Sequence, residues 1–190
     1  MLKVDHVSKV YSTGTFGGKA LRAVNDVSFY VGQGEVVSLI GESGSGKSTI
    51  GKMILGLTPI SSGTITVDDV DISTLEKAEL KEYYREVQGV FQDPFSSYNP
   101  IFKADRVFEV LKNEFFPELN ATEWYSRVYG ELKDVGLNPY IILGKYPHQL
   151  SGGQQQRNLI ARALLQTNEL LVAHEISSML DATTRIDVLN

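Results

Sequence analysis

The stretch Gly41-Glu42-Ser43-Gly44-Ser45-Gly46-Lys47-Ser48-Thr49 decides the fold, because it is a phosphate-binding loop placed between an apolar run and a helix. The apolar run 36–40 predicts a strand. One face of the following helix is indicated by apolar residues at i, i+3, i+4 and i+7, which are Ile50, Met53, Ile54 and Leu57. Glycines let backbone N–H groups close around phosphate oxygens, Lys47 would bind the β and γ phosphates, and the Ser48 hydroxyl would bind Mg²⁺. The stretch therefore predicts a nucleotide site.

The composition is that of one soluble domain without disulfides. The chain has 190 residues, of which 42% are hydrophobic and 22% charged, enough to bury one sizeable core. Its net charge of −5 argues against broad electrostatic binding of nucleic acid, and its zero cysteines exclude disulfides and cysteine-ligated metal sites. No apolar stretch reaches the roughly 20 residues of a membrane span, and the start 1–5 is not typical of a signal peptide. We expect a single α/β domain, which would work at a membrane only as a peripheral subunit.

Strands are expected before the phosphate loop. Alternation predicts one strand over 2–11 and another with Val27, Phe29 and Val31 on one face. Tight turns between such early strands favour an antiparallel sheet. Tyr11 lies at the end of the first strand, where its ring could stack on adenine or could equally be a tyrosine at the rim of the sheet.

Downstream of the first helix, we expect strands over 64–67 and 87–91 and a short helix over 76–84. The strand 87–91 ends at Gln92-Asp93-Pro94, where Gln92 could order Mg²⁺ or the attacking water, or could be an ordinary loop residue. Two helical stripes follow, formed by Val107, Phe108, Leu111 and Phe115 and by Trp124, Val128, Leu132 and Val135. A helical block between strands predicts a separate lobe.

Ser151 opens a further helix. Ser151 and Gln154 have the spacing of a capping box, and Gly152 and Gly153 leave the helix N-terminus bare. Such an end offers N–H groups, a hydroxyl and a favourable dipole to an anion, although taken alone it is only a well-capped helix. A second phosphate cradle would be useful if it closed on a nucleotide held by another subunit.

The run 170–173 predicts a buried strand that delivers His174 and Glu175 to its carboxyl end. Ligands of open parallel sheets bind at such ends. In phosphate-loop enzymes one carboxylate here supports Mg²⁺ and a second can activate water. Glu175 fits the second role, so it is the candidate general base.

On these residues the chain resembles the ATP-binding subunits of ABC transporters, most closely those of the peptide (oligopeptide/dipeptide) importer group. The resemblance covers essentially all 190 residues. Its specific parts are the loop at 41–49, Val-Phe-Gln-Asp-Pro-Phe-Ser-Ser-Tyr-Asn-Pro at 90–100, Leu-Ser-Gly-Gly-Gln at 150–154 and Ser-Met-Leu-Asp at 178–181. The signature Leu-Ser-Gly-Gly-Gln after a phosphate loop indicates the superfamily, and the segments after Gln92 and at 23–29 indicate peptide importers.

The resemblance implies a role for each matched position. Tyr11 would stack on adenine, Gln92 and Glu175 would be catalytic, and Ser48 and Gln92 would lie at Mg²⁺. The phosphates of ATP would be bound by Gly41, Ser43, Gly44, Ser45, Gly46, Lys47, Ser48 and Thr49. ATP on the opposite subunit would be met by Ser151, Gly152, Gly153, Gln154 and Asp181. Two ATP molecules would thus be sandwiched in a head-to-tail dimer whose closing and opening drive the membrane subunits.

The chain departs from the family's pattern at three points. Family members carry aspartate where this chain has His174, and proline then threonine where it has Ile176 and Ser177. Magnesium prefers oxygen ligands, so an imidazole is a poor replacement for the aspartate. The chain also stops at Asn190, before the last core strands and the histidine that follows them in the family. We therefore expect a C-terminally truncated chain with weak ATPase activity; the alternative is that His174 and the end at Asn190 come from a partial or error-bearing sequence.

The expected fold is α/β, a P-loop NTPase core with an N-terminal antiparallel β subdomain and an inserted helical subdomain. Its single ABC-type domain would divide into a nucleotide core with the β subdomain, over about 1–94 and 160–190, and a helical subdomain carrying the signature motif, over about 95–159.

The resemblance implies an ATP-binding and hydrolysing subunit, an ATPase that powers solute transport, with peptides as the expected solute. ATP and Mg²⁺ would be its cofactors, and a second ATP-binding subunit, in a homo- or heterodimer, and transmembrane permease subunits would be its partners, with no nucleic acid. It would be peripheral, at the cytoplasmic face of the cell membrane. Two alternatives stay open: a nucleotide-binding, weakly hydrolysing regulatory or degenerate subunit, and a soluble ABC protein of DNA repair or translation.

Overall fold

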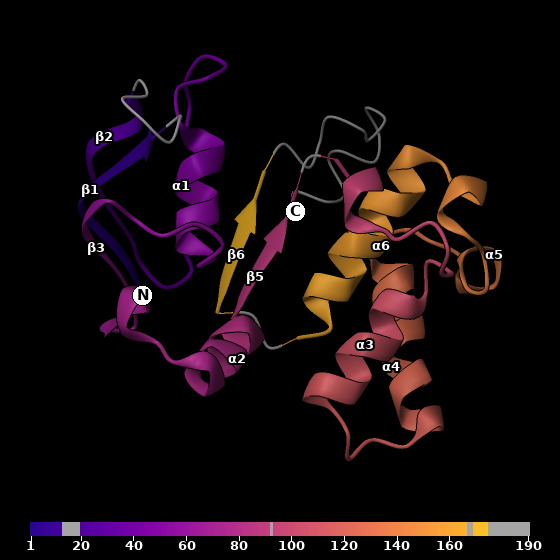
Figure 1. Ribbon diagram of the computed structural model, residues 1–190. Helices are drawn as coiled ribbons and strands as arrows, with labels where there is room; N and C mark the ends of the chain where they lie inside the picture. Colours follow the sequence, from indigo (N-terminus) through magenta and orange to yellow (C-terminus); the bar gives the residue numbers. More distant parts are fainter. Residues whose placement is uncertain (13–19, 92, 167–168, 175–190) are drawn as a thin grey trace. The chain divides into compact units, whose positions relative to one another are not determined.

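The computed structural model describes residues 1–12, 20–91, 93–166 and 169–174, which form an α/β fold (Figure 1). The chain divides into two compact units, Met1–Val87 and Gln88–Asn190. Among the described residues, no helix is both long and apolar enough to cross a membrane. The assignment of 160–190 to the nucleotide core stays a prediction.

In the part of the first unit that the structure describes, there are a four-stranded sheet and two helices. The strands follow the order β2-β1-β3-β4, and every neighbouring pair is antiparallel. The strands are β1 (Leu2–Ser12), β2 (Ala20–Val31), β3 (Ser62–Val67) and β4 (Val70–Asp71), and the helices are α1 (Lys47–Ile54) and α2 (Lys77–Glu86), with a 3₁₀ turn η1 (Ile72–Thr74). The predicted antiparallel sheet of early strands is confirmed.

Strand β1 is the inner strand between β2 and β3, and its alternating apolar residues determine which face of it is buried. Val4 and Val7 are buried, and Val4 is paired with Phe29 on one side and Ile65 on the other. The register slips between Val4 and Val7, where His6 on β1 and Asp26 on β2 both have positive φ. These two residues bond through His6 Nδ1 and Asp26 Oδ1 at 2.8 Å. The slip is a β-bulge, which restores the apolar face after one polar interruption.

The strand predicted over 36–40 is wrong for the described structure. Residues 35–42 have no regular secondary structure, and Val36 and Ile40 are each 95% exposed. A strand needs a hydrogen-bonded neighbour, and in the described part of the chain no strand pairs with this run. The helix prediction is also too long, because α1 ends at Ile54 and leaves Leu57 exposed.

The described residues of the second unit form a two-stranded sheet and a group of helices. Strands β5 (Val87–Val90) and β6 (Leu170–Ala173) are neighbours and run in the same direction in Figure 1. The prediction that the run 170–173 is a buried strand is wrong in its burial, because Leu171 is 39% exposed. The helices are α3 (Arg106–Phe115), α4 (Ala121–Asp134), α5 (Pro139–Ile142) and α6 (Gly152–Leu164), with 3₁₀ turns η2 (Phe95–Ser97) and η3 (Pro147–Gln149).

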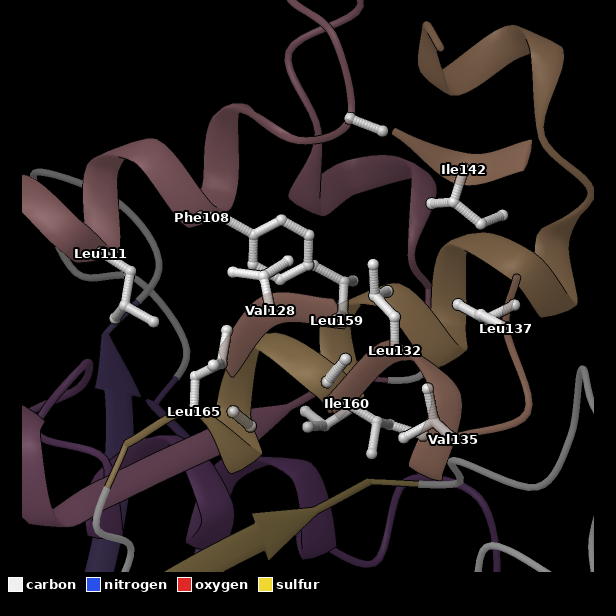
Figure 2. Close-up of a cluster of buried hydrophobic side chains, with 14 of the residues drawn as sticks. Phe108, Leu111, Val128, Leu132, Val135, Leu137, Ile142, Leu159, Ile160 and Leu165 are labelled. Atoms are coloured by element: carbon white, nitrogen blue, oxygen red, sulfur yellow. The ribbon is translucent and has the colours of Figure 1, made fainter. Parts of the chain in front are cut away.

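The core of the second unit lies between α3, α4 and α6 (Figure 2). Both predicted helical stripes contribute to it. The buried members that come from these three helices include Phe108, Leu111, Trp124, Val128, Leu132, Leu159 and Ile160. This apolar packing fixes the axis of α6, whose N-terminus carries the signature motif.

Candidate functional site

The phosphate loop packs directly against strand β2 in the first unit. Helix α1 begins at Lys47, after Gly46, whose φ of 95° is left-handed. A Cβ at Gly46 would lie 2.4 Å from the carbonyl oxygen of Ala23 and 3.1 Å from Cγ2 of Val24. Only glycine accepts both this conformation and this approach. The loop therefore reaches its place on β2 because Gly46 has no side chain.

Lys47 is held inside the loop by oxygen atoms. Its Nζ donates to the carbonyl oxygens of Gly41 at 2.6 Å and Glu42 at 2.8 Å, and to Oγ of Ser45 at 3.3 Å. The backbone N–H of Ser45 also donates to the Glu42 carbonyl at 3.2 Å. The ammonium is thus held among oxygen atoms of the loop, and phosphate oxygens would replace part of this carbonyl set.

The first turn of α1 suits an anion and a hard cation. Within the described residues no side-chain hydrogen bond from the N-cap residue Gly46 caps this helix, whose N-terminus is the positive end of its dipole. Ser48 lies in that turn, and its hydroxyl is an oxygen ligand of the kind Mg²⁺ prefers. Thr49 follows it, and Ser43 and Gly44 form the turn that precedes the helix. These residues fit a nucleotide triphosphate with its metal.

Tyr11 lies on the same sheet as the phosphate loop. Tyr11 is 37% exposed near the end of β1, and it is paired with Leu21 on β2. Two residues earlier, Lys9 is paired with Val24, whose side chain lies against Gly46. The structure therefore brings Tyr11 and the loop to one end of the β1–β2 pair. Adenine stacking by Tyr11 stays a prediction.

Ser151 caps α6 in the second unit, as the sequence predicts. Its Oγ accepts from the Gln154 N–H at 3.2 Å, and Gln154 Oε1 accepts from the Ser151 N–H at 2.9 Å. The capping box is confirmed. Gly152 and Gly153 form the first turn and are half-buried. The end is a rigid, well-defined helix N-terminus with two side-chain-free positions.

A buried polar network behind this helix end was missed from the sequence. The Tyr98 hydroxyl donates to the Gln155 carbonyl at 3.1 Å and accepts from Asn158 Nδ2 at 2.9 Å, while Asn158 also donates to the Ala104 carbonyl at 3.3 Å. Gln155 Nε2 donates to the Pro147 carbonyl at 2.7 Å. Burial raises the pKa of Tyr98 to about 12, so the phenol stays a neutral donor.

Two further side chains of α6 reach the strand that precedes Gln92. Gln156 Nε2 donates to the Phe91 carbonyl at 3.2 Å, and the Arg162 guanidinium donates to the Gly89 carbonyl at 3.5 Å. Burial lowers the pKa of Arg162. The polar residues in the middle of an otherwise apolar helix are the sequence signal for these contacts. They fix the backbone on the N-terminal side of Gln92.

His174 directly follows β6, at the carboxyl end of that strand. The backbone N–H of His174 donates to the Val90 carbonyl at 2.9 Å, which sets His174 beside the end of β5. Gln92, Glu175 and Asp181 lie outside the described residues. Among the residues that are described, no group of three or more metal-ligating side chains is present. The roles of Gln92, Glu175 and Asp181 stay predictions.

A model of the family described as ABC transporter matches residues 24–178 of this chain. The chain is 39% identical over 195 residues to a probable peptide ABC transporter ATP-binding protein of Sinorhizobium fredii, covering 100% of this chain and 54% of that protein. It is 43% identical over 171 residues to the oligopeptide transport ATP-binding protein OppF of Lactococcus lactis, covering 88% and 52% respectively. The chain thus spans about half the length of these relatives.

Two more comparisons extend over most of the matched protein. The phosphonates import ATP-binding protein PhnC of Lactococcus lactis is 39% identical over 200 residues, covering 100% of this chain and 76% of that protein. A solved dimeric structure of the ATP-binding cassette MJ0796, in a post-hydrolysis state bound to ADP and Pi, has a TM-score of 0.89 and 31% identity, covering 100% of this chain and 80% of that one. The similarity therefore includes sequence motifs and the fold.

Proposed function

The chain belongs to the ABC transporter family, and from this premise we propose that it is the ATP-binding and hydrolysing part of a subunit that powers the import of peptides across a membrane. One observation carries the proposal: the loop 41–49 packs on β2 with Lys47 held inside it and with Tyr11 at the same end of the sheet. The names of two relatives, which are peptide and oligopeptide transport ATP-binding proteins, support the choice of solute.

In the proposed mechanism, Lys47 exchanges carbonyl contacts for oxygens of the β and γ phosphates. Backbone N–H groups of the first turn of α1 bind the same phosphates, and Tyr11 stacks on the adenine. The hydroxyl of Ser48, with Gln92, would hold Mg²⁺. When bound, this ion supplies positive charge to the phosphates. Glu175 accepts the proton of the attacking water.

A second subunit completes the site in this proposal. Ser151 and Gly153 of the opposing subunit face the γ phosphate, with Gly152, Gln154 and Asp181 at the same interface. The dimeric ADP- and Pi-bound cassette supports this arrangement by similarity. Permease subunits would then respond to closing and opening of the pair, which puts the protein at the cytoplasmic face of the membrane.

The alternative of a degenerate, regulatory subunit has no support from the comparisons, since the relatives named above are transport or import ATP-binding proteins. The expectation that His174 weakens hydrolysis stays a prediction. The choice of peptides, rather than another solute, is the most specific statement in the proposal.

Titration calorimetry with Mg-ATP tests the nucleotide site. We expect the parent chain to bind ATP and Lys47→Ala to lose most of its affinity, because the ammonium is the cation closest to the phosphates. Lys52→Ala, on the last turn of the same helix, is the matched control and should bind like the parent. Equal affinity in the parent and Lys47→Ala would contradict the assignment.

A further inference from the structure

Lys9 is a lysine at a core-facing position of β1. Only 8% of it is exposed, and it continues the buried face of Val4 and Val7 across the bulge. A buried ammonium is unfavourable unless polar partners surround it. Its Nζ donates to the Pro59 carbonyl at 2.6 Å and lies 5.0 Å from the centroid of the Tyr11 ring. The charge is therefore placed between a backbone oxygen and an aromatic face.

The backbone around Pro59 is firmly attached to β1. The Ser61 N–H donates to the Ser8 carbonyl at 2.9 Å, and the Val10 N–H donates to Ser61 Oγ at 3.0 Å. These bonds flank Lys9 on both sides. The Pro59 carbonyl is thus a fixed acceptor, and it fixes the ammonium in turn.

The ammonium contacts one face of the Tyr11 ring. Residues i and i+2 of a strand point to the same side, so Lys9 approaches Tyr11 from within the sheet's own face. Tyr11 is 37% exposed with this contact in place. A cation on one face of an aromatic ring holds the ring in one orientation. The other face then presents a flat apolar surface for stacking.

The register places this ring near the phosphate loop. Lys9 is paired with Val24, and Val24 Cγ2 would lie 3.1 Å from a Cβ on Gly46. Tyr11 lies two residues further along β1, away from that contact. A ligand with phosphates in the loop and a base attached to them would extend along this direction.

We propose that Lys9 is a positioning residue for nucleotide base recognition: held by Pro59, it fixes the Tyr11 ring so that its exposed face stacks on the purine of a triphosphate whose phosphates occupy the loop 41–49. This inference rests on the proposed function and adds a determinant of base selectivity to it. Purines benefit most because their stacking area is larger than that of pyrimidines.

The test compares the affinities of ATP, CTP and inorganic tripolyphosphate by titration calorimetry, each with Mg²⁺, for the parent chain, four single variants and one double variant. We expect Lys9→Met to weaken ATP binding by roughly three- to tenfold, to reduce the preference for ATP over CTP, and to leave tripolyphosphate affinity within about twofold of the parent. Lys9→Gln keeps a donor for Pro59 but lacks the charge, so it should behave like Lys9→Met. Lys9→Arg keeps both and should retain ATP affinity.

The fourth variant, Tyr11→Ala, shows whether the lysine acts through the ring. Adding Lys9→Met to Tyr11→Ala should weaken ATP binding no further. A role in folding alone would lower the affinities for ATP and tripolyphosphate together, and that outcome overturns the inference, as does unchanged ATP affinity in both Lys9→Met and Lys9→Gln. A parent chain that binds neither ATP nor tripolyphosphate overturns the proposed function and this inference with it.

Discussion

Replacing Gly46 by alanine tests the packing of the phosphate loop on β2. The new Cβ would lie 2.4 Å from the Ala23 carbonyl oxygen, whereas Cβ atoms in proteins essentially never lie within 3.0 Å of such an atom. The loop or the strand must therefore retreat by at least about half an ångström. Gly46 also has a φ of 95°, which a residue with a side chain adopts only at a cost.

These two effects add. A side chain in the left-handed region costs about 1–2 kcal/mol, and forced overpacking costs about 1–3 kcal/mol. We expect Gly46→Ala to lower the free energy of unfolding of the first unit by about 2–5 kcal/mol. Gly44→Ala is the matched control, because Gly44 has a φ of 85° but its Cβ would meet nothing within 4 Å. Its loss should be only about 1–2 kcal/mol.

Amide hydrogen exchange in β1 and β2 measures the difference in stability between Gly46→Ala and Gly44→Ala, because these strands belong to the unit that contains both substitutions. The protein's one tryptophan, Trp124, lies in the second unit, so its fluorescence does not report on the first. The extra about 1–3 kcal/mol in Gly46→Ala corresponds to roughly five- to 150-fold faster exchange than in Gly44→Ala. Equal exchange in the two variants would refute the close approach of Gly46 to Ala23.

Two other predictions concern the buried network and the bulge. Tyr98→Phe should lower the free energy of unfolding of the second unit by about 1–3 kcal/mol, because it leaves Asn158 with one buried partner fewer; urea denaturation followed by Trp124 fluorescence measures this, and Tyr140→Phe, at a 79% exposed side chain, should be unchanged. The hydrogen bond and the charge of Asp26 raise the pKa of His6 above 6.5, so the pair stabilises the fold fully below about pH 6.5 and loses that contribution as pH rises through the folded pKa. An NMR titration of His6 should show the raised pKa in the parent and a lower one in Asp26→Asn, and equal values would contradict the contact.

Much of the fold could be predicted because its elements follow local rules. Alternation located β1, apolar helical spacing located α3 and α4, and the Ser151–Gln154 box located the start of α6. The strand prediction for the run 36–40 was wrong because apolar residues show only that a segment can be a strand. Whether it becomes one depends on a partner strand, and no sequence pattern within the run specifies that partner.

The motif of the candidate site could be predicted from the sequence, but the residues that hold the surrounding elements in place could not. The residues of the loop 41–49 themselves predict phosphate binding. The role of Lys9 depends on the contact of its Nζ with the Pro59 carbonyl, and this contact is visible only in the fold. Likewise, Tyr98 and Asn158 are 60 residues apart and meet only through packing. Contacts between residues that are far apart in the sequence leave no local sequence pattern. The one exception is a polar residue at a position where the spacing predicts an apolar one.

The two helix ends assigned to phosphate differ in what a phosphate must displace. At α1, within the described chain, no side-chain hydrogen bond from the N-cap residue Gly46 caps the first turn, and an arriving phosphate competes with carbonyl oxygens for Lys47. At α6, the Ser151 hydroxyl already accepts the Gln154 N–H, and such a cap contributes about 1 kcal/mol. The end of α6 also brings no cation of its own in the signature 150–154. We therefore expect ATP to bind first at α1, and the end of α6 to engage only a phosphate that a partner subunit already holds.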